Sequence, residues 1–115
     1  MTTYNAERFV REAVQSVLDQ TFGDFEFIIV DNCSSDRTIE IIEGFQDNRI
    51  QLICNEKNLG QTRALNIGLR QARAPWIARM DADDVCAANR FEVQWEFLQA
   101  NPHIAVVGSW RLDIN

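Results

Sequence analysis

Carboxylates that follow two apolar segments are the side chains of this sequence best placed to do chemistry. Asp31 ends one such segment, and Asp81, Asp83 and Asp84 follow another. If both segments are parallel strands, their carboxyl ends meet at one edge of a sheet, where the acids converge and repel one another. Solvent or a divalent cation relieves that repulsion, and carboxylates without a nearby histidine or thiol suit Mg²⁺ or Mn²⁺. We therefore expect Asp81 and Asp83 to hold such an ion, whose shell the phosphates of a nucleoside diphosphate would complete.

The same residues have a simpler interpretation. Aspartate side chains commonly accept hydrogen bonds from free backbone N–H groups in turns and at helix N-termini. For the run Asp81–Asp84 taken alone both interpretations stay open, and Asp31 taken alone fits a turn better. The tripeptide Asn58-Leu59-Gly60 is likewise typical of an ordinary turn.

Composition narrows the class of protein. The chain has 115 residues, with 11 Lys+Arg against 17 Asp+Glu and a net charge of -6 at pH 7. That length suits one domain with its own core. The acidic excess and the lack of a Lys/Arg run argue against a nucleic-acid partner, because binding phosphates needs basic clusters. No stretch approaches the ~20 apolar residues of a membrane span, and the N-terminus lacks a signal-peptide pattern.

The cysteines indicate the compartment. Cys33, Cys54 and Cys86 are odd in number and widely spaced, as expected of free thiols in a reducing environment. We therefore expect a cytoplasmic protein, attached to the inner face of the membrane, if at all, through regions outside this sequence. The sequence carries no signal for an oligomeric state.

Apolar periodicity predicts alternating helices and strands. Helices are expected from about residue 6 with Asn5 as N-cap, around Ile39–Phe45 with Ser35 or Asp36 as cap, over Thr62–Ala72 and over Arg90–Ala100; strands are expected at Phe25–Val30, Ile50–Ile53, Pro75–Met80 and Ile104–Val107. Short connections between alternating elements predict an α/β fold, with a Rossmann-like, open and mostly parallel sheet covered by helices on both faces.

The ends of the chain do not match a complete sheet of this kind. The first predicted helix has about five residues before it, whereas such sheets begin with a strand. Residues 112–115 carry no terminating signal. We therefore expect one domain, residues 1–115, truncated at both ends and cut within or just after its first strand.

Taken in order, the short motifs of this chain resemble a known family. They are Thr3-Tyr4-Asn5, Gln20-Thr21-Phe22, Phe25–Asp31, Ser34–Thr38, Asn58-Leu59-Gly60, Ala64–Gly68, Asp81–Asp84 and Val106–Ser109. The chain resembles the N-terminal, nucleotide-sugar-binding half of family 2 glycosyltransferases, which have the GT-A fold. The resemblance covers nearly the whole sequence, and it rests on the order and spacing of the motifs together.

The resemblance implies roles at particular positions. Thr3 and Tyr4 would lie against the nucleoside, and Asp31 would hydrogen-bond the base, usually uracil. Asp81 would contact the ribose or diphosphate, and Asp83 would ligate Mn²⁺ or Mg²⁺. The stretch from Asn58 to Asn66 would border the base and phosphates, with Arg63 as its only plausible cation.

The sequence also departs from the family pattern. Members commonly have a second acid and a glycine after the acid that matches Asp31, where this chain has Asn32 and Cys33. Many members have an arginine where this chain has Leu65, and the loop after the acidic run, residues 85–89, lacks the usual proline. The lost charge would alter base or ribose contacts, and the lost glycine removes a residue that tolerates unusual backbone angles.

The resemblance implies sugar transfer from a nucleotide-diphospho-sugar, a UDP-sugar foremost, to a hydroxyl of a saccharide or lipid-linked acceptor, in cell-surface polysaccharide or glycan synthesis. Family members invert the anomeric centre, with a carboxylate base on the acceptor and a metal on the leaving diphosphate. That base is expected beyond residue 115, so this chain alone should bind a donor but transfer sugar poorly.

Other classes of protein stay open beside this one. The substitutions at Asn32 and Cys33 are compatible with a nucleotide-binding module or a degenerate transferase without turnover. A nucleotidyltransferase would show a basic, glycine-rich loop after its first strand, and a phosphoreceiver domain an acid pair there and a lysine after its last strand. Neither signature is present in this sequence.

Overall fold

The computed structural model describes residues 1–109, and all structural statements below concern that range. Its elements are β1 (Thr2–Thr3), α1 (Val10–Leu18), β2 (Phe27–Asp31), α2 (Thr38–Glu43), β3 (Ile50–Cys54), α3 (Gln61–Gln71) and α4 (Arg90–Ala100). Residues 112–115, at which the sequence predicts a truncated end, lie outside the described range.

Strand β2 is the centre of the fold because its residues are apolar on both faces of the sheet. The sheet has the order β1-β2-β3, and both neighbours run parallel to β2. Thr3 lies opposite Asp31 on one side, and Cys54 lies opposite Asp31 on the other. The carboxyl end of β2 is therefore the point where all three strands end together.

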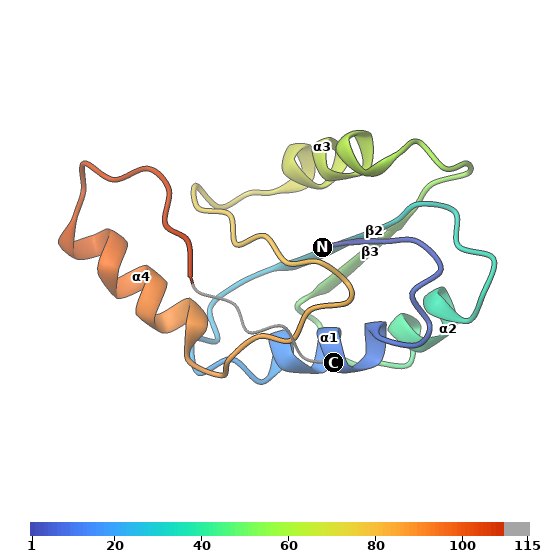
Figure 1. Cartoon of the computed structure of the whole chain (residues 1–115), viewed down its shortest axis with the longest axis horizontal. Helices are drawn as coiled ribbons and strands as arrows, with labels where there is room; N and C mark the ends of the chain where they lie inside the picture. Colours follow the sequence, from blue (N-terminus) through green and yellow to red (C-terminus); the bar gives the residue numbers. More distant parts are fainter. Residues whose placement is uncertain (110–115) are drawn as a thin grey trace.

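Helices cover both faces of this sheet, as the sequence predicted (Figure 1). Helices α1 and α2 lie on one face, where α1 buries Val10, Ala13, Val14 and Val17 along a single stripe against the strands. Helix α3 lies on the opposite face, and it approaches β2 closely through two small residues. Ala64 is fully buried there, and a Cβ added at Gly68 would lie 3.4 Å from Val30 Cγ2. The predicted α/β class is thus confirmed.

The predictions of strands at Pro75–Met80 and Ile104–Val107 are wrong. Residues 75–80 form no strand, and only Asp81, just after them, makes an isolated parallel bridge to Thr2. In the register of that bridge Met80 lies opposite Met1, and within residues 1–109 no strand pairs with residues 76–79. Residues 104–107 also form no strand, and Val106 is 85% exposed. An apolar run becomes a strand only where a neighbour supplies hydrogen bonds.

The N-terminal segment also differs from its prediction. A short strand, β1, does precede the first helix, and α1 begins only at Val10. Asn5 does not cap that helix: its φ is 47°, and its Oδ1 accepts a hydrogen bond from the Ser35 N–H at 2.9 Å. Neither Ser35 nor Asp36 is the N-cap of α2, which is Arg37. Asp36 still contacts the start of this helix, because its Oδ1 accepts the Thr38 N–H at 3.0 Å.

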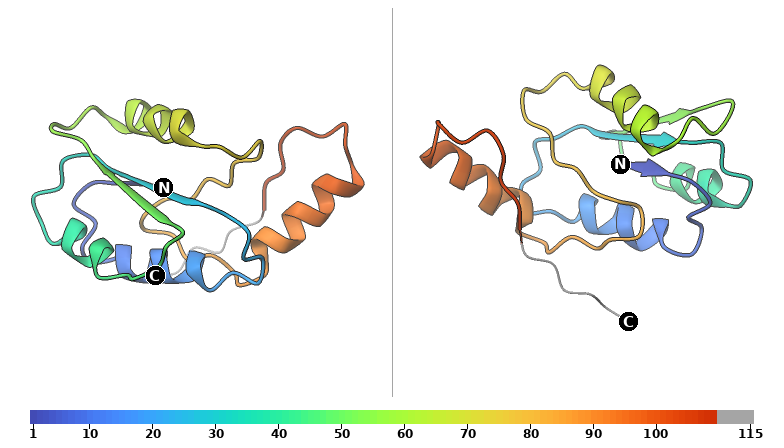
Figure 2. Two further views of the ribbon diagram at one scale, coloured as in Figure 1. Left: turned by 180° about the vertical axis from the view of Figure 1, so that it is seen from behind. Right: turned by 45° about the horizontal axis from the view of Figure 1, so that its top comes forward.

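Helix α4 lies at one end of the molecule, away from the strands (Figure 2). It contacts the segment before β2 through aromatic pairs, Phe91 with Phe25 at 5.5 Å and Trp95 with Phe22 at 5.9 Å between ring centroids. None of the helices within residues 1–109 is long and apolar enough to cross a bilayer. The three cysteines are free thiols, as predicted, with Cys86 buried and the other two exposed.

Candidate functional site

A cavity of about 630 Å³ opens at the carboxyl ends of β1 and β2. Its lining includes five of the predicted site residues, Thr3, Tyr4, Asn58, Asp81 and Asp83. They come from three separate stretches of sequence, which the fold brings to one edge of the sheet. The volume lies in the range of small-molecule sites, and the position is where open parallel sheets bind ligands.

The two predicted metal ligands lie on one side of this cavity. The bridge to Thr2 fixes the backbone of Asp81, and the buried Ala82 anchors the turn that leaves Asp83 exposed. Asp81 is held further by Arg79, whose Nη2 donates to its Oδ1 at 2.7 Å. The acidic run therefore forms a turn and also places two carboxylates in one cavity.

The carboxylates suit one kind of metal site and not another. Within residues 1–109 no three His, Cys, Asp or Glu side chains gather closely enough to enclose an ion. A dedicated protein cage for a cation is therefore a poor fit. The half-buried Asp81 and the exposed Asp83 in an open cavity do fit Mg²⁺ or Mn²⁺, because these ions commonly take one or two protein carboxylates and complete their shell with water and substrate phosphates.

Asp31 lies beneath the cavity and not at its surface. Its side chain is fully buried, and its Oδ1 accepts hydrogen bonds from Thr3 Oγ1 at 2.7 Å and Ser34 Oγ at 2.5 Å. Its Oδ2 accepts the Ser34 N–H at 2.8 Å. Ser34 Oγ in turn accepts the Asn5 N–H at 2.9 Å. Asp31 therefore ties the end of β1 to the loop after β2, and it holds the Thr3–Asn5 segment that borders the cavity.

Asn32 lines the cavity, although the sequence marked it only as a departure from a family pattern. It is 4% exposed, and its Oδ1 accepts the Leu59 N–H at 2.9 Å. Its Nδ2 donates to Asn58 Oδ1 at 2.7 Å. Two features of the sequence could have indicated this role. Asn32 is a short polar residue directly after a buried strand, and two further asparagines, Asn55 and Asn58, follow the next strand.

Arg63 is not among the residues that line the cavity, and its side chain is exposed on α3. Its neighbours Gln61 and Ala64 do line it. Two aromatic side chains complete the mouth: Tyr4 is 53% exposed, and Phe9, which the sequence did not suggest as a site residue, is 48% exposed.

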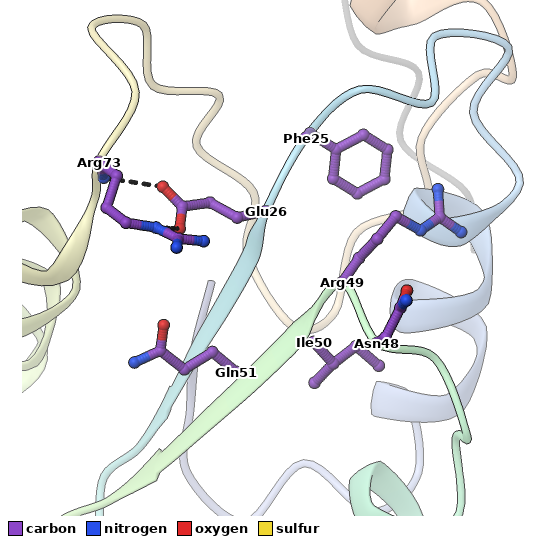
Figure 3. Close-up of a pocket in the computed structure, with 7 residues that line it drawn as sticks. All are labelled: Phe25, Glu26, Asn48, Arg49, Ile50, Gln51 and Arg73. Carbon is purple, nitrogen blue, oxygen red and sulfur yellow. Dashed lines mark hydrogen bonds and ion pairs between the residues drawn. The ribbon is translucent and has the colours of Figure 1, made fainter.

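A second hollow, of about 300 Å³, lies at the opposite ends of β2 and β3 (Figure 3). Arg73 crosses it to Glu26, with Nε donating to Oε2 at 2.9 Å and the backbone N–H to Oε1 at 2.7 Å. These hydrogen bonds lower the pKa of Glu26. The charged groups of this hollow satisfy one another, so the cavity at the carboxyl ends is the better candidate site.

Comparisons with known proteins agree with that choice. The sequence model described as Glycosyl transferase family 2 matches residues 1–114. A protein named as an uncharacterized glycosyltransferase in Haemophilus influenzae is 38% identical over 109 residues, which cover 93% of this chain and 34% of that protein. The UDP-Glc:alpha-D-GlcNAc-diphosphoundecaprenol beta-1,3-glucosyltransferase of Escherichia coli is 35% identical over 112 residues, covering 97% of this chain and 44% of that protein. The chain thus spans less than half the length of these relatives.

Solved structures share the fold. Residues 1–349 of TarS from S. aureus, in complex with UDP-GlcNAc, match with a TM-score of 0.82 and 28% identity, covering 88% of this chain and 30% of that one. The mannosyltransferase PcManGT from Pyrobaculum calidifontis, in complex with GDP-Man and Mn²⁺, matches with a TM-score of 0.77 and 25% identity, covering 88% of this chain and 31% of that one. These neighbours have the GT-A fold, as the sequence predicted.

Proposed function

Because the chain belongs to glycosyl transferase family 2, we propose that it forms the donor-binding part of an inverting glycosyltransferase. The donor is a nucleotide-diphospho-sugar, with a UDP-sugar as first choice. The acceptor is a hydroxyl of a saccharide or of a lipid-linked saccharide, in the synthesis of cell-surface polysaccharide or glycan. The E. coli relative, by its name, takes UDP-Glc and a diphosphoundecaprenol-linked acceptor, which supports this choice of substrates.

One observation carries the proposal: the cavity at the carboxyl ends of the strands brings Asp81 and Asp83 together with Thr3, Tyr4 and Asn58. An aromatic ring suits a nucleoside, and carboxylates suit a cation that carries a diphosphate. TarS also binds UDP-GlcNAc on the same fold, which supports a nucleotide-sugar in this cavity.

We assign Asp83 and Asp81 to a bound Mn²⁺ or Mg²⁺. When bound, the ion supplies charge stabilisation for the leaving diphosphate. The chain's own contribution is to hold both carboxylates at the cavity wall, through the backbone bridge at Thr2 and the buried Ala82. The Mn²⁺ in the PcManGT complex supports a divalent metal in this family.

Two further role assignments stay predictions. Asp31 is predicted to hydrogen-bond the base, although in this structure its oxygens bond Thr3 and Ser34. Arg63 is predicted to border the phosphates from outside the cavity lining. No general base is assigned, because the carboxylates that line the cavity within residues 1–109 are the two assigned to the metal. The exposed thiols of Cys33 and Cys54 support a cytoplasmic location.

Calorimetric titration of UDP tests the proposal, with and without Mn²⁺, on the wild type, on Asp83→Ala and on a matched control, Asp24→Ala. Asp24 is exposed and does not line the cavity. We expect Mn²⁺-dependent binding that Asp83→Ala abolishes and Asp24→Ala leaves intact. Absence of binding in the wild type would contradict the donor site. Metal-dependent UDP binding without sugar transfer from UDP-sugars in the full-length protein would favour the alternative, a nucleotide-binding module or degenerate transferase.

A further inference from the structure

Two asparagine side chains meet at the cavity wall and hold the loop between β3 and α3. Asn32 Nδ2 donates to Asn58 Oδ1 at 2.7 Å, and Asn58 Oδ1 also accepts the Gly60 N–H at 2.9 Å. Asn32 Oδ1 accepts the Leu59 N–H at 2.9 Å and Asn55 Nδ2 at 3.2 Å. Every polar atom of the buried Asn32 amide is therefore in use.

The backbone fixes which way both amides face. A backbone N–H can only donate, so the atom of Asn58 that faces Gly60 must be its oxygen. The same oxygen faces Asn32, so Asn32 must present its nitrogen there, and the Leu59 N–H independently requires the Asn32 oxygen on the other side. The N–H groups of Leu59 and Gly60 thus determine the orientation of both side-chain amides, independently of any bound ligand.

This arrangement leaves one donor group unused. Within residues 1–109 no hydrogen bond engages Asn58 Nδ2, and Asn58 lines the cavity. An N–H donor in that place matches an acceptor oxygen, such as those of a phosphate, a ribose or a nucleobase carbonyl.

We propose that Asn32 is a positioning residue of the donor site, which turns Asn58 so that its Nδ2 group donates a hydrogen bond to an acceptor oxygen of the bound nucleotide-sugar. This inference rests on the proposed function and deepens it. It also assigns a purpose to the neutral amide at position 32. An aspartate there would place a carboxylate oxygen 2.7 Å from Asn58 Oδ1, the distance that the hydrogen bond now spans. Asn58 would then have to turn its oxygen away from Gly60.

The substitution Asn58→Asp separates the two roles of Asn58. A carboxylate keeps the oxygen that accepts from Asn32 and Gly60, so the loop keeps its hydrogen bonds. The remaining polar atom of this cavity-lining side chain changes from the donor Nδ2 into an acceptor oxygen. We expect UDP affinity, measured by calorimetry with Mn²⁺, to fall at least tenfold, while hydrogen exchange of the Leu59 and Gly60 amides stays as slow as in the wild type.

A matched variant accounts for the added charge. Gln61→Glu places one negative charge in the same cavity, and Gln61 is not a hydrogen-bond partner of either asparagine side chain within the described residues, so it reports the effect of charge on UDP affinity. Asn58→Asp should lose clearly more affinity than Gln61→Glu. Equal losses in the two variants would overturn the contact between Asn58 and the donor.

Asn32→Asp tests the positioning role. We expect faster exchange of the Gly60 amide together with a loss of UDP affinity, while the Leu59 amide keeps its acceptor oxygen at position 32. Asn48→Asp, at an exposed asparagine at the other end of the sheet, should change neither the Gly60 exchange nor the affinity. Wild-type binding that Asn32→Asp leaves unchanged would overturn this inference and spare the proposed function. A wild type that binds no UDP would overturn the proposed function and, with it, the ligand contact inferred here.

Discussion

Arg79 bonds both oxygens of Asp81 through a single nitrogen, with Nη2 2.7 Å from Oδ1 and 3.0 Å from Oδ2. The carboxylate that we assign to a metal is therefore already engaged by a cation of the protein. Both side chains keep contact with solvent, at 55% and 33% exposure, so the pair is weak enough to be exchanged. A metal ion that uses Asp81 must compete with this guanidinium for the same lone pairs.

Replacing Arg79 should therefore strengthen metal binding. An exposed ion pair contributes up to about 1 kcal/mol, which corresponds to roughly a fivefold change in affinity. We expect Arg79→Gln to lower the Mn²⁺ concentration needed for UDP binding by about two- to fivefold on that basis, measured by calorimetry at a fixed concentration of UDP. Arg70→Gln, which removes an exposed charge from α3, is the control. Weaker metal binding in Arg79→Gln would show that Arg79 serves the site in another way.

The buried carboxylate of Asp31 should be important for stability. It accepts three hydrogen bonds, from Thr3 Oγ1, Ser34 Oγ and the Ser34 N–H. Asparagine at this position would place an NH₂ group against one of these donors, and a buried unsatisfied polar group costs about 1–3 kcal/mol. We expect Asp31→Asn to lower the free energy of unfolding in urea by about 2 kcal/mol, and Asp24→Asn, at an exposed position, to change it by less than about 0.5 kcal/mol. Equal stability of the two variants would contradict the role of the Asp31 network.

The elements that could be predicted from the sequence are those with their own local signal. The stripe from Val10 to Val17 indicated α1, and the branched run before Asp31 indicated β2, to within a few residues. Residues 75–80 and 104–107 carried an equally good apolar signal but form no strand. A strand depends on hydrogen bonds from a neighbour, and no local pattern reports whether that neighbour is present.

In the candidate site, too, residues with a local sequence signal could be predicted, and residues whose role depends on distant partners could not. The position of Asp81 and Asp83 in the cavity could be predicted from carboxylates that directly follow an apolar segment, although the segment of residues 75–80 is no strand and only the isolated bridge from Asp81 to Thr2 joins it to the sheet. The role of Asn32 could not, because it depends on a turn 23 to 27 residues further along the chain. The burial of Asp31 was missed for a related reason: its hydrogen-bond partner Thr3 lies on another strand.

Cys33 adopts a backbone conformation that favours glycine, with a φ of 70°. The left-handed region costs residues with a Cβ roughly 1 kcal/mol, and branching at Cβ raises that cost. We expect Cys33→Gly to raise the free energy of unfolding by up to about 1 kcal/mol and Cys33→Val to lower it by about 1 kcal/mol. Urea unfolding measures both. If Cys33→Val proved as stable as the wild type, the loop after β2 would have to take another conformation.

The ion pair between Arg49 and Asp47 should make the stability of the fold depend on pH. Arg49 bonds Asp47 with its backbone N–H at 2.9 Å, with Nε at 3.0 Å and with Nη2 at 2.8 Å. The hydrogen bonds from the Arg49 side chain, and then that from its backbone, lower the pKa of Asp47 to about 2 from its usual 3.8. The same guanidinium lies over the Phe25 ring at 4.7 Å and donates to the Leu18 carbonyl at 3.1 Å, so it connects α1 to the start of β3.

Since the pKa of Asp47 is lower in the folded protein than in the unfolded chain, the carboxylate stabilises the fold above pH 4 and loses that effect as the pH falls through about 2. We expect Asp47→Asn to be less stable than the wild type at pH 7, with the difference shrinking steadily between pH 4 and 2. Carbon NMR of the Asp47 carboxyl should show a titration midpoint near 2 in the folded protein, and Asp24→Asn should follow the wild type at every pH. A midpoint near 3.8, or a difference in stability that persists at pH 2, would show that the pair with Arg49 does not form in solution.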